Sequence, residues 1–358
     1  MSQSSENFWR ERPVFITGAT GLLGGWMVKE LVCRGAEVIA LIRDGSPRSF
    51  IAQEGLLNRI TIVRGSLEEY SQIRRALCEY SVDTVFHLAA QPLVGVAKLD
   101  PMATLDTNVR GTWHVLEAAR NAGTRRIVVA SSDKAYGPSD HLPYLETSPL
   151  QGQFPYDASK SCADLISRMY AATFNLPVTV VRCANLFGGG DLNFSRLLPD
   201  LIRSTLRGQR FVIRSDGKFI RDFLYVRDAV SGYLLLAEEM ARNTSLAGEA
   251  FNFGLELRVS VLELVHKTLA LMGRTDLQPV VENRISAEIR EQYMDSAKAR
   301  RVLGWLPRYT LEEGITETIA WYTLFEAGSA ASEDQTETAA ESMAAVCLAS
   351  GRGDYPVH

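Results

Sequence analysis

Short apolar runs alternate with helical segments through the first half of the chain, and this alternation limits the possible folds most strongly. The apolar runs, rich in valine and isoleucine, cover residues 13–17, 38–42, 60–63, 84–88, 127–130 and 178–182. Runs without polar alternation are typical of strands buried on both faces of a parallel sheet. The segments with helical spacing cover residues 25–34, 70–80, 102–122 and 156–174. Repeated βα units predict an α/β fold with a doubly wound parallel (Rossmann) sheet.

Three glycines stand where the first strand meets a helix. The strand runs directly into GATGLLG, residues 18–24. Glycines there permit a tight turn and close backbone approach, while free N–H groups at the helix start bind a pyrophosphate. The loop therefore predicts dinucleotide binding. The expected contacts in the loop are Gly18, Thr20, Gly21, Leu22, Leu23 and Gly24.

The identity of the dinucleotide depends on two residues after the second strand. Arg43 follows that strand directly, and Asp44 comes next. An acidic residue about 20 positions beyond the glycines binds the ribose hydroxyls of NAD, whereas an arginine pairs with the 2′-phosphate of NADP. We expect NAD, with NADP as the alternative.

The regular alternation weakens after residue 187, where three glycines interrupt the chain. The following part mixes helices with short strands and is too irregular for further βα repeats. We expect a dinucleotide-binding domain over residues 1–187, which also carries the catalytic residues, and a smaller, mostly substrate-binding region over 188–326. Residues 327–358 are small and polar, which predicts a disordered tail.

The composition argues against several other functions. With 38 basic and 42 acidic residues, the net charge is −4, so no basic excess is present to hold nucleic acid. The five cysteines form no CxxC pair and the histidines lack ligand spacing, so we expect no metal. No apolar run approaches the ~18 residues of a membrane span. The N-terminal stretch lacks the apolar core of a signal peptide, so we expect a cytoplasmic protein without membrane contact.

A tyrosine and a lysine one helical turn apart predict acid–base chemistry. Tyr156 and Lys160 are at positions i and i+4 of a predicted helix and share one face. The ammonium is expected to lower the pKa of the phenol and to hold the nicotinamide ribose. A phenol with a lowered pKa can take a proton from a sugar hydroxyl.

With the glycine loop and this pair, the stretches HLAAQ (87–91) and TNVRGT (107–112) resemble the extended short-chain dehydrogenase/reductase superfamily over about residues 10–325. The resemblance implies a homodimer formed through helices 102–122 and 156–174. Ser66 stands where the superfamily usually has an aspartate near the adenine. The resemblance implies cofactor contacts by Arg43, Asp44, Ser66, Leu67, Leu88, Ala89, Ala90, Asn108, Tyr156 and Lys160.

The stretch SSDKAYG, residues 131–137, narrows the resemblance to nucleotide-sugar 4,6-dehydratases. Ser132 matches the hydroxyl of the superfamily triad, and the Asp133-Lys134 pair resembles CDP-glucose 4,6-dehydratase. The stretches HLAAQPLV (87–94) and GGGD (188–191) resemble it as well. The resemblance implies that Lys134, or a group that it activates, removes a proton from C5 of the sugar and that Asp133 protonates the departing C6 hydroxyl.

Four residues are expected on the substrate side. Asn185 and Arg221 match residues that meet the sugar nucleotide's phosphates in the family, and a guanidinium suits phosphate oxygens. Gln91 and Arg290 complete the expected substrate contacts, although Arg290 equally fits a solvated helix position.

Three alternatives stay open. GDP-mannose 4,6-dehydratases usually carry Glu where Lys134 stands, but they favour NADP and an arginine like Arg43. A C4 epimerase or a ketosugar reductase uses the same Tyr-Lys pair. A non-catalytic dinucleotide-binding regulator is the third, and the intact Ser132, Tyr156 and Lys160 argue against it.

Overall fold

A parallel seven-stranded sheet forms the centre of the molecule in the computed structural model, which describes residues 8–284 and 289–328. Its strand order is β11-β6-β5-β4-β1-β2-β3, and every neighbouring pair is parallel. The strands are β1 (Pro13–Thr17), β2 (Glu37–Ile42), β3 (Thr61–Arg64), β4 (Thr84–His87), β5 (Arg126–Ala130), β6 (Val178–Cys183) and β11 (Ala250–Phe253). The doubly wound fold is confirmed.

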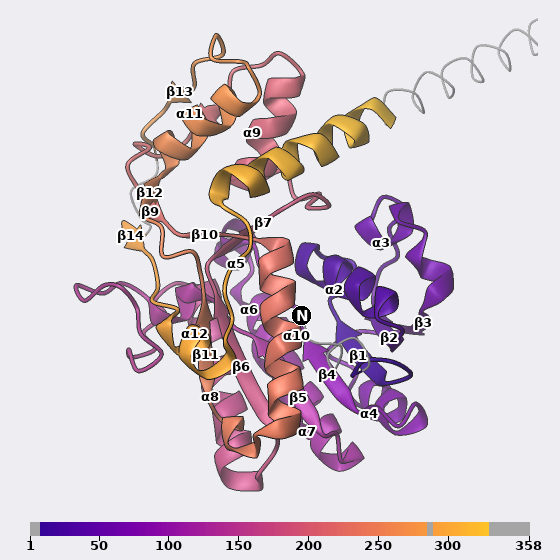
Figure 1. Cartoon of the computed structure of the whole chain (residues 1–358). Helices are drawn as coiled ribbons and strands as arrows, with labels where there is room; N and C mark the ends of the chain where they lie inside the picture. Colours follow the sequence, from indigo (N-terminus) through magenta and orange to yellow (C-terminus); the bar gives the residue numbers. More distant parts are fainter. Residues whose placement is uncertain (1–7, 285–288, 329–358) are drawn as a thin grey trace, which may run out of the picture.

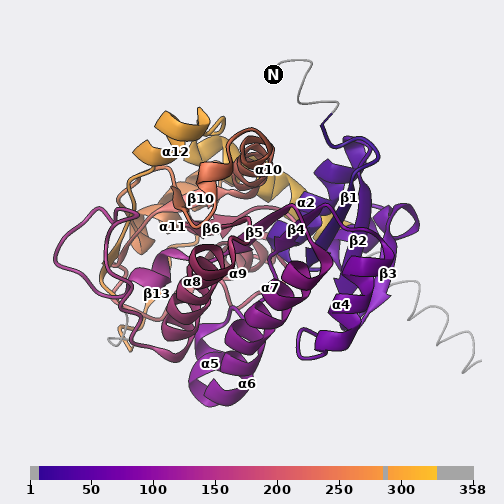
Figure 2. The ribbon, with the colours of Figure 1, turned by 90° about the horizontal axis from the view of Figure 1, so that it is seen from below.

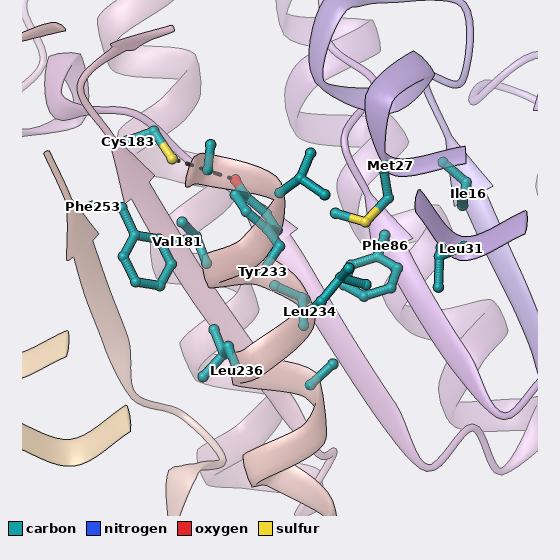
Figure 3. Close-up of a cluster of buried hydrophobic side chains, with 14 of the residues drawn as sticks. Ile16, Met27, Leu31, Phe86, Val181, Cys183, Tyr233, Leu234, Leu236 and Phe253 are labelled. Atoms are coloured by element: carbon teal, nitrogen blue, oxygen red, sulfur yellow. Dashed lines mark hydrogen bonds between the residues drawn. The ribbon is translucent and has the colours of Figure 1, made fainter. Parts of the chain in front are cut away.

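Helices cover both faces of this sheet (Figure 2). One face carries α4 (Tyr70–Glu79), α7 (Gly111–Ala122) and α8 (Pro155–Phe174), whose buried side chains share one core with the strands. The other face carries α2 (Leu22–Cys33) and α10 (Val226–Arg242), and α12 (Ala297–Leu303) packs beside them. Figure 3 shows part of this second core, where Met27 and Leu31 of α2 and Tyr233 of α10 pack over the sheet.

The expectation that βα repeats end at residue 187 is wrong. Helix α10 crosses the sheet, and β11 then pairs in parallel with β6 as the seventh strand. The 42 residues between β6 and α10 (184–225) conceal this repeat, because the chain first leaves the sheet to build part of the smaller region. The final strand, AFNF, is also only four residues long.

The predicted helix 102–122 is interrupted. It consists of α6 (Pro101–Leu105), a π-helical turn (Asp106–Arg110) and α7. A π turn widens the helix locally and is common at functional sites. Here the turn carries the buried Asn108.

The smaller region has its own core and lies at the top of Figure 1. It contains α9 (Leu197–Leu206), α11 (Val261–Leu271) and a helix over residues 311–328. Its short strands are β7 (Asn185–Phe187), β8 (Val212–Ile213), β9 (Ile220–Arg221), β10 (Phe223–Tyr225), β12 (Val259–Ser260), β13 (Val280–Val281) and β14 (Glu291–Gln292).

The remaining short elements lie outside this region, in the loops of the main sheet. They are α3 (Phe50–Gln53), α5 (Val94–Leu99) and 3₁₀ turns at Leu56–Arg59, Asp133–Tyr136 and Thr244–Leu246.

Two further sequence predictions concern the C-terminal tail and membrane-spanning segments. The predicted tail, 327–358, lies outside the described residues except for its first two positions, which belong to the last helix. Within residues 8–284 and 289–328, no helix combines the length and apolar character needed to cross a membrane.

Candidate active site

A large open cavity lies at the carboxyl ends of the sheet strands, where open α/β sheets bind their ligands. Its volume is about 1300 Å³, more than the ~300–1000 Å³ of a typical small-molecule site. The lining comes from the loops after β1, β2, β4 and β5 and from the smaller region around α9. The cavity therefore has room for two ligands side by side.

The glycine loop forms one wall mainly through its backbone. Gly18 has φ +78°, and a Cβ there would lie 2.7 Å from the backbone nitrogen of Ala89. A Cβ on Gly24 would lie 2.0 Å from the carbonyl oxygen of Gly18. Helix α2 begins immediately after Gly21, so its first N–H groups face the cavity side of the turn. The loop fits the pyrophosphate of a dinucleotide, and all six predicted loop residues line the cavity.

Arg43 and Asp44 lie at the adenosine end and bind each other. Arg43 Nε is 2.6 Å from Asp44 Oδ2, and both side chains are largely exposed on the cavity lining. The two charges partly neutralise one another, so neither is preorganised for a ligand alone. Ser66 and Leu67 also line this end, and the Ser66 hydroxyl accepts a bond from the backbone N–H of Glu68.

The loop after β4 is held by a buried hydrogen-bonded chain. Thr17 Oγ1 accepts from the backbone N–H groups of Leu88 and Ala89, both at 3.1 Å. His87 lies between Thr17 and Thr112, and burial lowers its pKa to about 3, so the imidazole is neutral. These contacts place Leu88, Ala89 and Ala90 on the cavity wall.

Asn108 and Gln91 lie behind that wall and bind each other. The Asn108 amide accepts from Gln91 N–H at 2.7 Å, and its Nδ2 donates to the Gln91 carbonyl and to Ser159 Oγ. The Gln91 side chain bonds to Leu93 and Thr104. Neither is among the cavity-lining residues, so the structure gives both a positioning contact where the sequence predicts a ligand contact.

The five predicted catalytic residues all line the cavity. Ser132 Oγ donates to Asp133 Oδ1 at 3.0 Å, while Asp133 Oδ2 is buried without a hydrogen-bond partner. Lys134 Nζ donates to Gln292 Oε1 at 2.7 Å. A carboxyl group on the cavity lining is placed where a general acid toward a bound ligand would have to lie.

The pKa of Tyr156 differs in direction from the sequence expectation. Burial raises it to about 12, and Asp133 adds to the rise. Arg196 and a hydrogen bond with Ser132 oppose this rise, whereas Lys160 is not among the principal causes. Lys160 Nζ instead donates to the Ala130 carbonyl at 2.8 Å, and burial lowers its pKa to about 8. Tyr156 therefore needs further positive charge nearby before it can act as a base.

Arg196 is a cavity residue that the sequence reasoning missed. Its Nη1 lies 2.8 Å from Asp191 Oδ2, and it stands at the start of α9. The only available signal was its position shortly after the GGGD stretch, because nothing local distinguishes it from a surface arginine. A guanidinium here suits anionic ligand oxygens.

Of the predicted substrate residues Asn185, Arg221 and Arg290, only Asn185 lines the cavity. Arg221 is buried, and its Nη1 donates to the carbonyls of Ile220 and Arg290. The Arg290 side chain is exposed, and neither arginine is among the lining residues. In the described chain, no group of three or more His, Cys, Asp or Glu side chains is arranged to hold a metal ion.

The chain belongs to the NAD dependent epimerase/dehydratase family, whose model matches residues 14–254. It is 32% identical to CDP-glucose 4,6-dehydratase of Salmonella typhimurium over 331 residues, 88% of this chain and 92% of that protein. It is also 32% identical to a dTDP-4-dehydro-6-deoxy-D-allose reductase of a Streptomyces species, covering 88% and 98%. The fold matches dTDP-glucose 4,6-dehydratase of Bacillus anthracis in complex with NAD, with TM-score 0.76, 25% identity and coverage of 87% and 96%.

Proposed function

We propose that the protein is an NAD-dependent nucleotide-sugar 4,6-dehydratase, a hydro-lyase, with CDP-glucose as substrate and CDP-4-keto-6-deoxyglucose as product. The observation that carries the proposal is that Ser132, Asp133, Lys134, Tyr156 and Lys160 line the same cavity as the glycine loop. The similarity to CDP-glucose 4,6-dehydratase supports this choice of substrate.

NAD fits the cavity wall formed by residues 18–24, where side chains are excluded at Gly18 and Gly24. Lys160 would hold the nicotinamide ribose, and Asp44 the adenosine ribose. NAD bound there supplies a hydride acceptor for C4 of the sugar, a hydride donor for C6 and positive charge beside Tyr156. The B. anthracis dehydratase in complex with NAD supports this cofactor, and NADP is the alternative.

The side chains of Ser132, Asp133, Lys134 and Tyr156 would bind, accept and donate the protons of the reaction. Tyr156 takes the proton of the C4 hydroxyl as C4 is oxidised to a ketone, and Ser132 binds the same oxygen. The ketone acidifies the C5 proton, which Lys134 removes. Asp133 protonates the departing C6 hydroxyl, so that one water leaves. A proton then returns to C5. NAD bound at the glycine loop would accept the hydrogen of C4 and deliver it to C6, so that the cofactor would end in its starting state.

A ketosugar reductase is the second candidate, because the Streptomyces reductase is as similar in sequence as the Salmonella dehydratase. Oxidation or reduction at C4 needs Tyr156, Ser132 and Lys160 alone. Only dehydration needs both an acid and a base at Asp133 and Lys134. The presence of both Asp133 and Lys134 on the cavity lining favours the dehydratase.

The predicted homodimer belongs to the same proposal. Helices α7 and α8 expose large apolar side chains, Trp113 on α7 and Leu165, Met169 and Phe174 on α8. A second copy packing on this surface would cover them as a four-helix bundle. Light scattering of dilute protein tests this, and a fully active monomer would contradict it. The cytoplasmic location stays a prediction.

A panel of CDP-, dTDP-, GDP- and UDP-sugars tests the reaction. Each is incubated with the purified protein and analysed by mass spectrometry. We expect loss of one water, most rapidly from CDP-glucose. Unchanged mass with an altered C4 centre would indicate an epimerase, and a gain of two hydrogens on 4-keto substrates with added reduced cofactor would indicate a reductase. Identification of any cofactor released from the purified protein distinguishes NAD from NADP.

A further inference from the structure

Lys134 receives its hydrogen-bond partner from a distant part of the chain. Gln292 belongs to β14 in the smaller region, and its Oε1 accepts from Lys134 Nζ at 2.7 Å. The Gln292 side chain is fully buried, whereas Lys134 reaches the cavity. Within the described residues, none of the ion pairs includes Lys134 and the amide is the hydrogen-bond acceptor found for Nζ.

The backbone holds Gln292 firmly. Strand β14 runs parallel to β9, with Gln292 opposite Arg221. The Gln292 carbonyl accepts from Asp222 N–H at 3.1 Å, and Met294 pairs with Tyr144 two residues later. The amide therefore projects from a fixed strand toward Lys134, as expected for a residue that orients another side chain.

Stability does not explain a glutamine at this position. Its Nε2 is buried without a hydrogen bond of standard geometry, although the side chain lies close enough to Tyr144 to oppose the rise that burial causes in the pKa of that hydroxyl. An unsatisfied buried donor is unfavourable, and replacement by an apolar group of similar shape is often neutral or stabilising. The amide thus gains its purpose from the oxygen that faces Lys134.

The chemistry of the partner matters as well. A carboxylate beside an amine favours the ammonium form, which cannot act as a base. An amide oxygen accepts the same hydrogen bond without a full negative charge. The adjacent carboxylate, Asp133, receives a hydrogen bond from Ser132.

We propose that Gln292 is a positioning residue for Lys134, holding its amine beside the cavity through a neutral acceptor so that Lys134 can remove the C5 proton. This inference rests on the proposed dehydration. It assigns a step-specific role in the elimination to a residue of the smaller region.

The test is the Gln292→Met variant of the full chain, loaded with NAD and followed through a single turnover of CDP-glucose. Near-ultraviolet absorbance of reduced nicotinamide reports C4 oxidation, and quenched samples analysed by mass report water loss. We expect oxidation at the wild-type rate, accumulation of the absorbance, and water loss slowed ~10-fold or more, short of the ~10²–10⁴-fold that removal of a general base costs. The melting temperature should match that of the wild type.

Two further variants sharpen the result. Tyr225→Phe removes a hydrogen bond to Glu317 in the smaller region and contacts neither Gln292 nor Lys134, so we expect wild-type elimination. Gln292→Glu keeps an acceptor and adds a charge, so we expect slow elimination despite the retained hydrogen bond.

Three results would overturn the inference while leaving the proposed function intact. They are wild-type elimination by Gln292→Met, equal slowing of oxidation and elimination, and an equal loss of elimination in Tyr225→Phe. If the wild-type protein removed no water from any sugar nucleotide in the panel, the proposed function would fail first, and this inference with it.

Discussion

The two walls of the cavity are built in different ways. The cofactor wall consists mainly of backbone, shaped by Gly18 and Gly24 within one seven-residue loop. The reaction wall consists of side chains from the turn after β5 and from α8, which are distant in sequence, and β14 supports it from behind through Gln292. The first wall excludes side chains to admit a ligand, and the second places charged and polar atoms toward it. Changes to the two walls should therefore fail in different ways.

The largest effects are expected in the reaction wall. Tyr156→Phe should block the first oxidation and lower turnover ~10²–10⁴-fold, because it removes the proton acceptor. Lys134→Met should lower turnover to a similar extent but stop after C4 oxidation. Absorbance of reduced nicotinamide separates them, since it should appear only in Lys134→Met. Its appearance in Tyr156→Phe at the wild-type rate would contradict the assigned roles.

A smaller effect is expected in the pH dependence of the free energy of unfolding. Burial lowers the pKa of Lys160 to about 8 from its ordinary value of 10.5. Between these values the unfolded chain binds more protons than the folded one, so the free energy of unfolding rises with pH. The gain for cofactor-free wild type is up to ~3 kcal/mol, at about 1.4 kcal/mol per pKa unit.

Lys160→Met should lack this gain. Urea unfolding of both proteins at pH values across that interval measures it, and the difference between the two cancels the titration of other groups. Equal pH dependence in the wild type and the variant would show that burial does not perturb Lys160.

The cofactor wall should respond to added volume rather than to lost charge. A Cβ on Gly24 lies 2.0 Å from the Gly18 carbonyl oxygen, whereas one on Gly21 lies 3.4 Å from it. Gly24→Ala should therefore strain the loop by ~1–3 kcal/mol and weaken NAD binding accordingly. Gly21→Ala is the matched control and should bind NAD more tightly than Gly24→Ala. Equal affinities, measured by titration calorimetry, would refute the steric account.

The smallest effect is expected at the adenosine end. Asp44 is exposed and paired with Arg43, so Asp44→Ala should weaken NAD binding only ~2- to 5-fold, as for other exposed ion pairs. The same change should strengthen NADP binding, because it frees Arg43 and removes a negative charge. Tighter binding of NADP than NAD by the wild type would reverse the cofactor assignment.

The contrast between the walls also explains what the sequence could predict. The glycine loop and the first six sheet strands follow from local spacing, and the structure places them as expected. The sequence does not predict that strand β11 belongs to the central sheet, because a long excursion separates it from β6. Arg196 and Gln292 were missed because their roles depend on contacts across the fold, with Asp191 and Lys134 respectively. The pKa of Tyr156 is raised rather than lowered because the side chain is buried, and no local sequence motif indicates that burial.

The most direct test of the reaction wall is isotopic analysis of the product formed in deuterated water. The account predicts that CDP-glucose loses one water, that one solvent deuterium appears at C5, and that the hydrogen of C4 migrates to C6. Lys134→Met should incorporate deuterium at C5 far more slowly than the wild type. A product of unchanged mass with no deuterium at C5 would contradict dehydration and assign Asp133 and Lys134 another role.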